Sequence, residues 1–241
     1  MIKVIMYAAK AIAIAIAALF FSSCNFNGTD GSGNVVTQSR SVAGKFTAVS
    51  VSGGLEVFIE QGSKTSIVVE ADDNLQQHIK TELSGNELKI YCDVNIHDAG
   101  ATRITVTLPE IKSIEAAAGS SVKSKTILKN DSFSLTTDSG SSMEVAVDSQ
   151  KVNCEADSGS SLVVSGTTED LQTDSGSGSS LDAKELKAKT VTASSGSGST
   201  TQVNVTASLT AEASSGSSIS FTGKPTSISK KESSGGSVSQ D

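Results

Sequence analysis

The sequence Leu-Thr-Thr-Asp-Ser-Gly-Ser-Ser-Met-Glu-Val, residues 135–145, contains the pattern that decides the fold. An Asp-Ser-Gly-Ser-Ser segment lies between stretches in which every second residue is apolar or small. Related segments recur around seven glycines, whose numbers differ by 21, 19, 17, 20, 20 and 19: Gly119, Gly140, Gly159, Gly176, Gly196, Gly216 and Gly235. A period near twenty residues is typical of a repeat architecture in which each unit forms one coil.

Alignment of the repeats on these glycines places small or apolar residues in two columns, five and three positions before each glycine. The first column is Ile114, Leu135, Cys154, Leu171, Val191 and Ala211, and the second is Ala116, Thr137, Ala156, Thr173, Ala193 and Ala213. A separation of two residues places both columns on one side of a strand. The extra Ser-Gly pairs at 177–178 and 197–198 preserve this phase, so Leu181 also points inward. The alternation excludes helices and predicts an all-β fold, a parallel β-helix with about twenty residues per turn in the C-terminal half.

The inward columns change from small or apolar residues to charged ones in the last repeat, where they contain Lys230 and Glu232. Charged residues at these positions are expected if the last coil covers the apolar interior of a solenoid. A frayed tail beyond Lys231 is the alternative. Residues 42–112 alternate with the same period of two but lack the Ser-Gly repeat, and residues 72–79 are compatible with one helical turn.

The N-terminus has the order of an export signal. Lys3 and Lys10 precede an apolar run at 11–21, and Ser22 and Ser23 then precede Cys24. This order resembles the lipobox of bacterial lipoproteins, in which the cysteine is acylated; an ordinary cleaved secretory signal is the alternative. The predicted organisation is a lipoprotein signal peptide at 1–23, a flexible tether at 24–41, one β-helical head domain at 42–236 and a tail at 237–241.

Composition excludes several classes of function. The formal charge of −7 disfavours nucleic acid as a partner. Two histidines and the absence of a Cys-x-x-Cys motif give no basis for a metal site or a cofactor. Export would permit a disulfide, but Cys92 and Cys154 are in phase with apolar neighbours, which favours buried free thiols.

One column of polar residues is a candidate site. Asp138, Asp157 and Asp174 each lie two positions before a repeat glycine. A column of carboxylates, one per coil, could be solvated, could bind a cation such as calcium, or could supply the acid and base of a glycan-processing enzyme. No other arrangement in the sequence predicts catalytic residues.

The segments Val51-Ser-Gly-Gly-Leu-Glu-Val-Phe-Ile, Leu88-Lys-Ile-Tyr and Ile104-Thr-Val-Thr-Leu-Pro, together with the Gly-Ser-Ser turns, resemble the head-GIN-domain family of auto-transporter adhesins over residues 42–236. The resemblance implies an exported, right-handed β-helical head domain, often on a lipoprotein of Gram-negative bacteria. It supplies no catalytic or ligand motif.

Two functions follow as expectations. The first is a non-catalytic protein of the cell envelope, held at the outer membrane through a lipid on Cys24, with an adhesive role toward a glycan or a protein. The second is a glycan-processing enzyme on the same scaffold that uses the Asp138, Asp157 and Asp174 column. The sequence does not determine the oligomeric state, or whether the head faces the periplasm or the cell surface.

Overall fold

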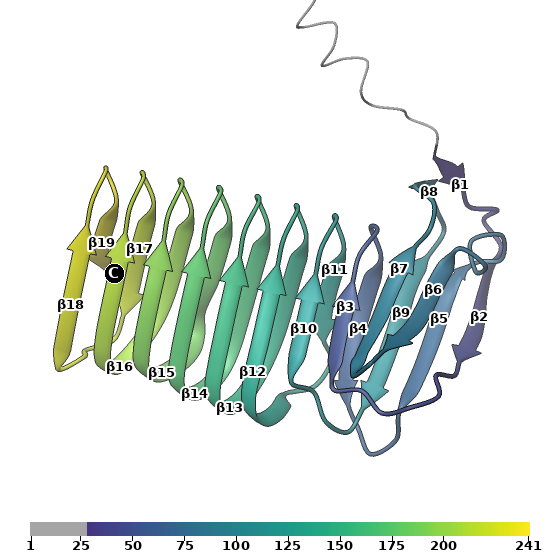
Figure 1. Ribbon diagram of the computed structural model, residues 1–241, viewed down its shortest axis with the longest axis horizontal. Helices are drawn as coiled ribbons and strands as arrows, with labels where there is room; N and C mark the ends of the chain where they lie inside the picture. The colour runs from purple at the N-terminus through teal and green to yellow at the C-terminus, as the bar shows by residue number, and fades with distance from the viewer. Residues whose placement is uncertain (1–27) are drawn as a thin grey trace, which may run out of the picture.

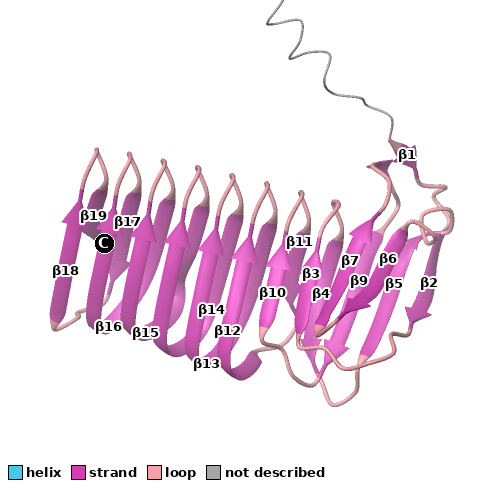
Figure 2. Cartoon of the chain, in the orientation of Figure 1, coloured by secondary structure: helices cyan, strands magenta, loops and turns pink. Residues whose placement is uncertain are grey.

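The computed structural model describes residues 28–241, and this part of the chain consists of strands, turns and loops (Figures 1 and 2). It contains no helix long and apolar enough to cross a membrane. The nineteen strands are β1 (Thr29–Asp30), β2 (Val35–Arg40), β3 (Ala48–Val51), β4 (Glu56–Gln61), β5 (Ser66–Asp72), β6 (Ile79–Ser84), β7 (Glu87–Cys92), β8 (Ile96–Asp98), β9 (Thr102–Leu108), β10 (Ser113–Ala116), β11 (Ser121–Ser124), β12 (Leu128–Thr137), β13 (Ser142–Ala156), β14 (Ser161–Ser175), β15 (Ser180–Ser195), β16 (Thr200–Ala213), β17 (Ser218–Thr222), β18 (Ser227–Glu232) and β19 (Ser237–Gln240).

The repeats stack into a solenoid of parallel strands with about seven turns, as the sequence predicts. Residues that lead into each Ser-Gly turn form a first layer, and residues that leave the turn form a second layer. In β13, for example, residues 151–156 pair with β12 in the first layer, whereas residues 142–144 pair with β11 in the second. The Ser-Gly turns lie in a row along one edge of the rod, which is the upper edge in Figure 1.

The inward columns form the interior. Leu135 is fully buried and Leu181 is 1% exposed, which confirms the inward direction predicted for both. Hydroxyl groups also reach the interior, where Ser175, Ser195 and Thr201 contact one another over 2.6–2.8 Å. These contacts satisfy polar groups that would otherwise destabilise a buried core.

The two cysteines that the structure describes are free thiols. Cys154 is buried and Cys92 is half-buried, so the prediction of buried thiols is confirmed fully only for Cys154. Burial raises the pKa of the Cys154 thiol to about 12, because the interior disfavours the thiolate. The Cys154 thiol is therefore chemically inert.

Each turn contains two consecutive residues with positive φ, as in a type I′ turn. In the turn at 138–141, Ser139 has φ 52° and Gly140 has φ 70°, and the Ser141 N–H donates to the Asp138 carbonyl over 3.2 Å. The Gly140 N–H donates to the Ser158 carbonyl of the next coil over 3.1 Å. The turns therefore form a hydrogen-bonded ladder along the rod.

A buried serine follows each turn glycine from Gly119 to Gly216. The Ser141 hydroxyl donates to the Ala116 carbonyl of the preceding coil over 2.7 Å, and the Ser179 hydroxyl donates to the Ala156 carbonyl over the same distance. The set comprises Ser120, Ser141, Ser160, Ser179, Ser199 and Ser217. The Gly-Ser-Ser segment thus divides its serines between one buried structural hydroxyl and one residue of the outer surface.

The turn glycine differs from the expected one in the two repeats that contain an extra Ser-Gly pair. Gly178 and Gly198 have positive φ and occupy the turn position, whereas the alignment used Gly176 and Gly196. Leu171 therefore lies level with Val152, not with Cys154. The shift is two residues, so every side chain keeps its predicted inward or outward direction.

The N-terminal half is more complex than a continuation of the repeat. The coil formed by β3 and β4 lies between β10–β11 and β7–β9, although it precedes both in the sequence. At the far end, β5 pairs antiparallel with β9, and β6 pairs antiparallel with β7. These antiparallel strands cover the edges that β7 and β9 would otherwise expose.

Three predictions about segments outside the repeats are revised. Residues 35–40 of the expected tether form β2, which pairs antiparallel with β5. Residues 237–240 of the expected tail form β19, which pairs with β17. Residues 73–78 form hydrogen-bonded turns and no helix, although the Gln76 N–H donates to the Asp72 carbonyl with helical spacing.

The charged residues of the last repeat cover the interior of the preceding coil. The Lys230 ammonium group donates to the Val238 carbonyl over 3.2 Å and lies 4.8 Å from the centre of the Phe221 ring. The Glu232 carboxylate accepts the Val238 N–H over 2.6 Å. These contacts hold β18 against β19, which confirms the covering role and excludes the frayed alternative.

Candidate functional site

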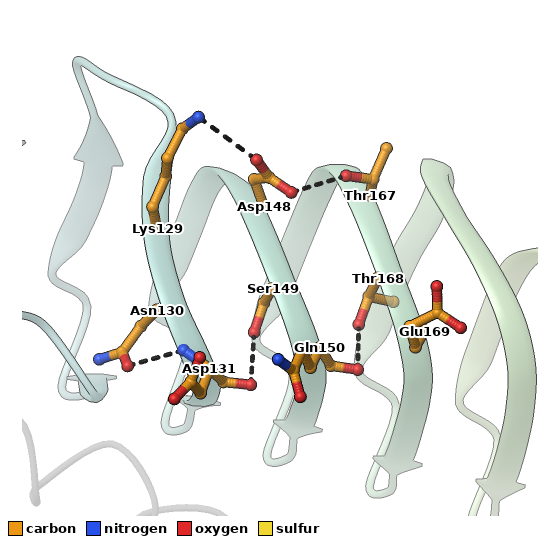
Figure 3. A pocket seen from close by; sticks show the side chains of 9 residues that line it. All are labelled: Lys129, Asn130, Asp131, Asp148, Ser149, Gln150, Thr167, Thr168 and Glu169. Atoms are coloured by element: carbon orange, nitrogen blue, oxygen red, sulfur yellow. Dashed lines mark hydrogen bonds and ion pairs between the residues drawn. The ribbon is translucent and has the colours of Figure 1, made fainter.

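A groove follows the edge of the rod opposite the Ser-Gly turns, where the long strands bend from the second layer into the first. Its larger part has a volume of about 540 Å³. We call it the edge groove, and its larger part is lined by Lys129, Asn130, Asp131, Asp148, Ser149, Gln150, Thr167, Thr168 and Glu169. Figure 3 shows that three successive coils each contribute three of these side chains.

The bend itself creates the groove. On one side of it, Asn130 pairs with Ser149, and on the other side Ser132 pairs with Lys151. The residue between them in each coil makes no strand pair, and its side chain is exposed at the bend. These residues are Asp131, Gln150, Glu169 and Lys189.

The row nearest the second layer contains complementary charges. The Lys129 ammonium group lies 3.4 Å from one oxygen of Asp148, and the Thr167 hydroxyl donates to the other oxygen over 3.1 Å. The Lys129 and Asp148 side chains are more than half exposed, so this ion pair adds little to stability. It orients the carboxylate of Asp148 and neutralises its charge.

The middle row contains two hydroxyl groups, of which that of Ser149 is half-buried and that of Thr168 is buried. Ser149 donates to the Asp131 carbonyl over 3.1 Å, and Thr168 donates to the Gln150 carbonyl over 3.2 Å. A hydroxyl group has one hydrogen to donate and two lone pairs to accept. Because the hydrogen is directed at the protein backbone, the lone pairs of the half-buried Ser149 oxygen remain as acceptors for a ligand.

The groove continues toward β16. A second depression of about 280 Å³ shares Thr167, Thr168 and Glu169 with the first and adds Lys187, Ala188, Lys189 and Thr206. The Lys189 ammonium group lies 3.2 Å from the Glu169 carboxylate. Three lysines (Lys129, Lys187, Lys189) and three acids (Asp131, Asp148, Glu169) give the combined groove a formal charge of zero.

The predicted aspartate column forms only in part. Asp138 and Asp157 occupy equivalent turn positions, and each carboxylate accepts the N–H of the serine that follows, over 2.6 and 2.7 Å. The Ser158 side chain, and then the Ser139 N–H, hold the pKa of Asp138 below its ordinary value by hydrogen bonds to the carboxylate.

Asp174 lies elsewhere, so the prediction of a three-aspartate column is wrong at this position. It pairs level with Glu155 in the first layer, because the turn of its coil is at Ser177 and Gly178. There it lines a shallow depression of about 180 Å³ together with Asn153, Glu155 and Gln172. Within residues 28–241, no group of three or more His, Cys, Asp or Glu side chains is arranged to hold a metal ion.

Cys24, the predicted lipid attachment residue, lies outside the described residues. The edge groove was not predicted from the sequence. Its residues differ in type from coil to coil, but Asp131, Gln150, Glu169 and Lys189 all lie nine residues before a turn glycine. That constant offset is the available signal, and it becomes visible only when Gly178 and Gly198 are recognised as the turn glycines.

Comparisons with solved structures confirm the fold. A "putative adhesin" from Bacteroides fragilis is 21% identical, with a TM-score of 0.83, and the match covers 89% of this chain and all of the other. A "putative adhesin" from Parabacteroides merdae is 15% identical, with a TM-score of 0.73 and coverage of 89% and 99%. A "putative lipid binding protein" from Parabacteroides distasonis is 19% identical, with a TM-score of 0.72 and coverage of 89% and 100%.

No curated protein matches the chain. A comparison with protein families matches residues 45–225, about three quarters of the sequence, to a single family. This range includes the coil of β3 and β4, the whole edge groove and every Ser-Gly turn except the last, at Gly235. The chain therefore belongs to the family described as "Putative auto-transporter adhesin, head GIN domain".

Proposed function

We propose that this protein is a non-catalytic adhesion protein of the bacterial cell envelope, anchored in the outer membrane through a lipid on Cys24, and that it binds its ligand in the edge groove. Membership of an adhesin family supports the adhesive role. The observation that carries the proposal is the groove itself, which crosses successive coils from β12 to β16 and has no net formal charge. Such a site fits an extended polar ligand of a glycan or protein.

The groove does not have the character of an acyl-chain site. The relative from Parabacteroides distasonis is described as a lipid binding protein. In this chain, however, the groove is lined almost entirely by charged, amide and hydroxyl side chains, and Leu135, Leu181 and their neighbours fill the apolar interior. Burial of a hydrocarbon chain against polar groups would desolvate them without new hydrogen bonds.

The adhesive role is tested by blocking the groove. Thr167 is exposed in the groove, and Thr200 is also exposed, on the second layer one residue outside a turn. Beads coated with the mature chain are tested for attachment to mucin, extracellular matrix and fixed bacterial cells. We expect the change Thr167→Arg to reduce attachment about tenfold, because a long cationic side chain fills the groove, and Thr200→Arg to have no effect. Equal attachment of both variants and the unchanged chain would refute binding in the groove.

The anchor is tested by cell fractionation. We expect Cys24→Ser to move the mature chain from the membrane fraction to the soluble fraction, because the acylated residue is lost. Cys92→Ser is the matched control and keeps the chain in the membrane fraction. Membrane association that persists in Cys24→Ser at normal expression would contradict the anchor.

A further inference from the structure

We propose that the edge groove takes a neutral polysaccharide, bound along the axis of the rod with about one sugar residue per coil. This inference rests on the proposed adhesive function and specifies its ligand. The groove crosses from β12 to β16, four steps between neighbouring strands. With strands about 4.8 Å apart, these steps span roughly 19 Å. The strand spacing is close to the length of one pyranose residue in an extended chain.

The charges of the groove favour an uncharged ligand. Lys129 is paired with Asp148, and Lys189 is paired with Glu169. A polyanion would meet three carboxylates, Asp131 among them, and a polycation would meet three ammonium groups. A ligand without charge avoids both repulsions and leaves the existing ion pairs intact.

The hydrogen-bonding groups match those of sugars. Ser149 presents an acceptor oxygen, because its hydrogen is directed at a backbone carbonyl, whereas Thr168 of the next coil is buried. Gln150, the next residue after Ser149, is exposed and has both an amide donor and an amide acceptor. A sugar hydroxyl group both donates and accepts, so it can bond to the Ser149 oxygen and to the Gln150 amide at once.

The lining also disfavours a protein partner. Protein interfaces are centred on buried aromatic or aliphatic anchors that fill apolar pockets. The combined groove is lined by no aromatic residue, and its one apolar residue is Ala188. A peptide would therefore find hydrogen bonds here but no pocket for an anchoring side chain.

The absence of aromatic rings from the lining predicts how affinity depends on ligand length. Without a ring to stack on, each sugar contributes only weak hydrogen bonds. Affinity must then come from the sum of the contacts that successive coils contribute. We expect affinity to rise with each added sugar until the chain fills the five strands from β12 to β16, and to stay constant for longer chains.

The test uses the mature chain and calorimetric titration with neutral oligosaccharides of two to eight residues: β-1,4-linked glucose, β-1,4-linked xylose and α-1,6-linked mannose. We expect at least one series to bind, with a Kd about tenfold lower for five residues than for two and unchanged above six. Gln150→Ala should raise that Kd about fivefold. Gln202→Ala, which removes the same side chain from the second layer outside the groove, should leave it unchanged.

Several outcomes would overturn the inference. They are failure of all three neutral series to bind, affinity that does not depend on chain length, and a Kd unaffected by Gln150→Ala. Binding of polygalacturonate or of a protein in the groove, blocked by Thr167→Arg, would overturn the neutral-glycan inference and leave the adhesive function intact. Attachment of coated beads that Thr167→Arg does not change would instead refute the adhesive function of the groove.

Discussion

The variant Leu135→Asp is expected to lose cooperative folding at room temperature. Leu135 is fully buried between Ile114 and Cys154 of the neighbouring coils. An aspartate there would place a carboxylate among apolar side chains that offer it no cation and no hydrogen bond. Burial of an unpaired charge costs several kcal/mol even when the group becomes protonated, a large part of the roughly 5–15 kcal/mol that stabilises a domain.

The matched control is Ser134→Asp. Ser134 precedes Leu135 in β12 and is exposed on the outside of the first layer. The same carboxylate remains hydrated there, so we expect the free energy of unfolding to change by no more than about 0.5 kcal/mol. Urea unfolding followed by circular dichroism measures both variants. If they lost similar amounts of stability, the assignment of inward and outward positions would be wrong.

The architecture could be predicted because every coil of a solenoid has the same pattern of inward and outward positions. The sequence of each coil independently predicts which positions point inward. A misalignment of one repeat therefore does not change the inward and outward assignment of the others. Leu135, Cys154 and Ala211 are all buried as the columns predict. Alternation with a period of two along a strand predicts the direction of each side chain, and this prediction does not depend on the conformation of the turns.

Register was less predictable because the two repeats with an extra Ser-Gly pair offer two glycines each. Ser-Gly-Ser-Gly at 175–178 can place either glycine in the turn, and composition does not distinguish them. The structure selects Gly178, since its N–H then continues the ladder to the Ser197 carbonyl over 3.0 Å. That choice moves Asp174 out of the aspartate column and brings Glu169 level with the bend residues of the groove.

The N-terminal coil could not be ordered from the sequence for a different reason. β3 pairs with β7 and β10, so its neighbours are both later in the chain, and no repeat marks the correspondence. Pairing between distant segments is decided by the whole assembly and not by local pattern. The alternation predicted strands there, and this prediction is confirmed, but not their order.

A second large effect is expected at Gly166, which lies in β14 just before the groove residue Thr167. Its φ is +114°, a conformation that other residues rarely adopt. A Cβ atom at this position would lie only 1.9 Å from the carbonyl oxygen of Val147 in the neighbouring strand. Because that oxygen belongs to the backbone, β13 and β14 would have to move apart to make room.

We therefore expect Gly166→Ala to lower the free energy of unfolding by about 3 kcal/mol or more, from backbone strain and the displaced strand together. Gly178→Ala is the control, because Gly178 also has positive φ, +71°, but nothing lies within 4 Å of its added Cβ. Its cost is the conformational penalty alone, about 1 kcal/mol. Urea unfolding of both variants separates the two contributions. Equal losses would show that strand contact at Gly166 adds nothing, and that this glycine is needed only for its backbone conformation.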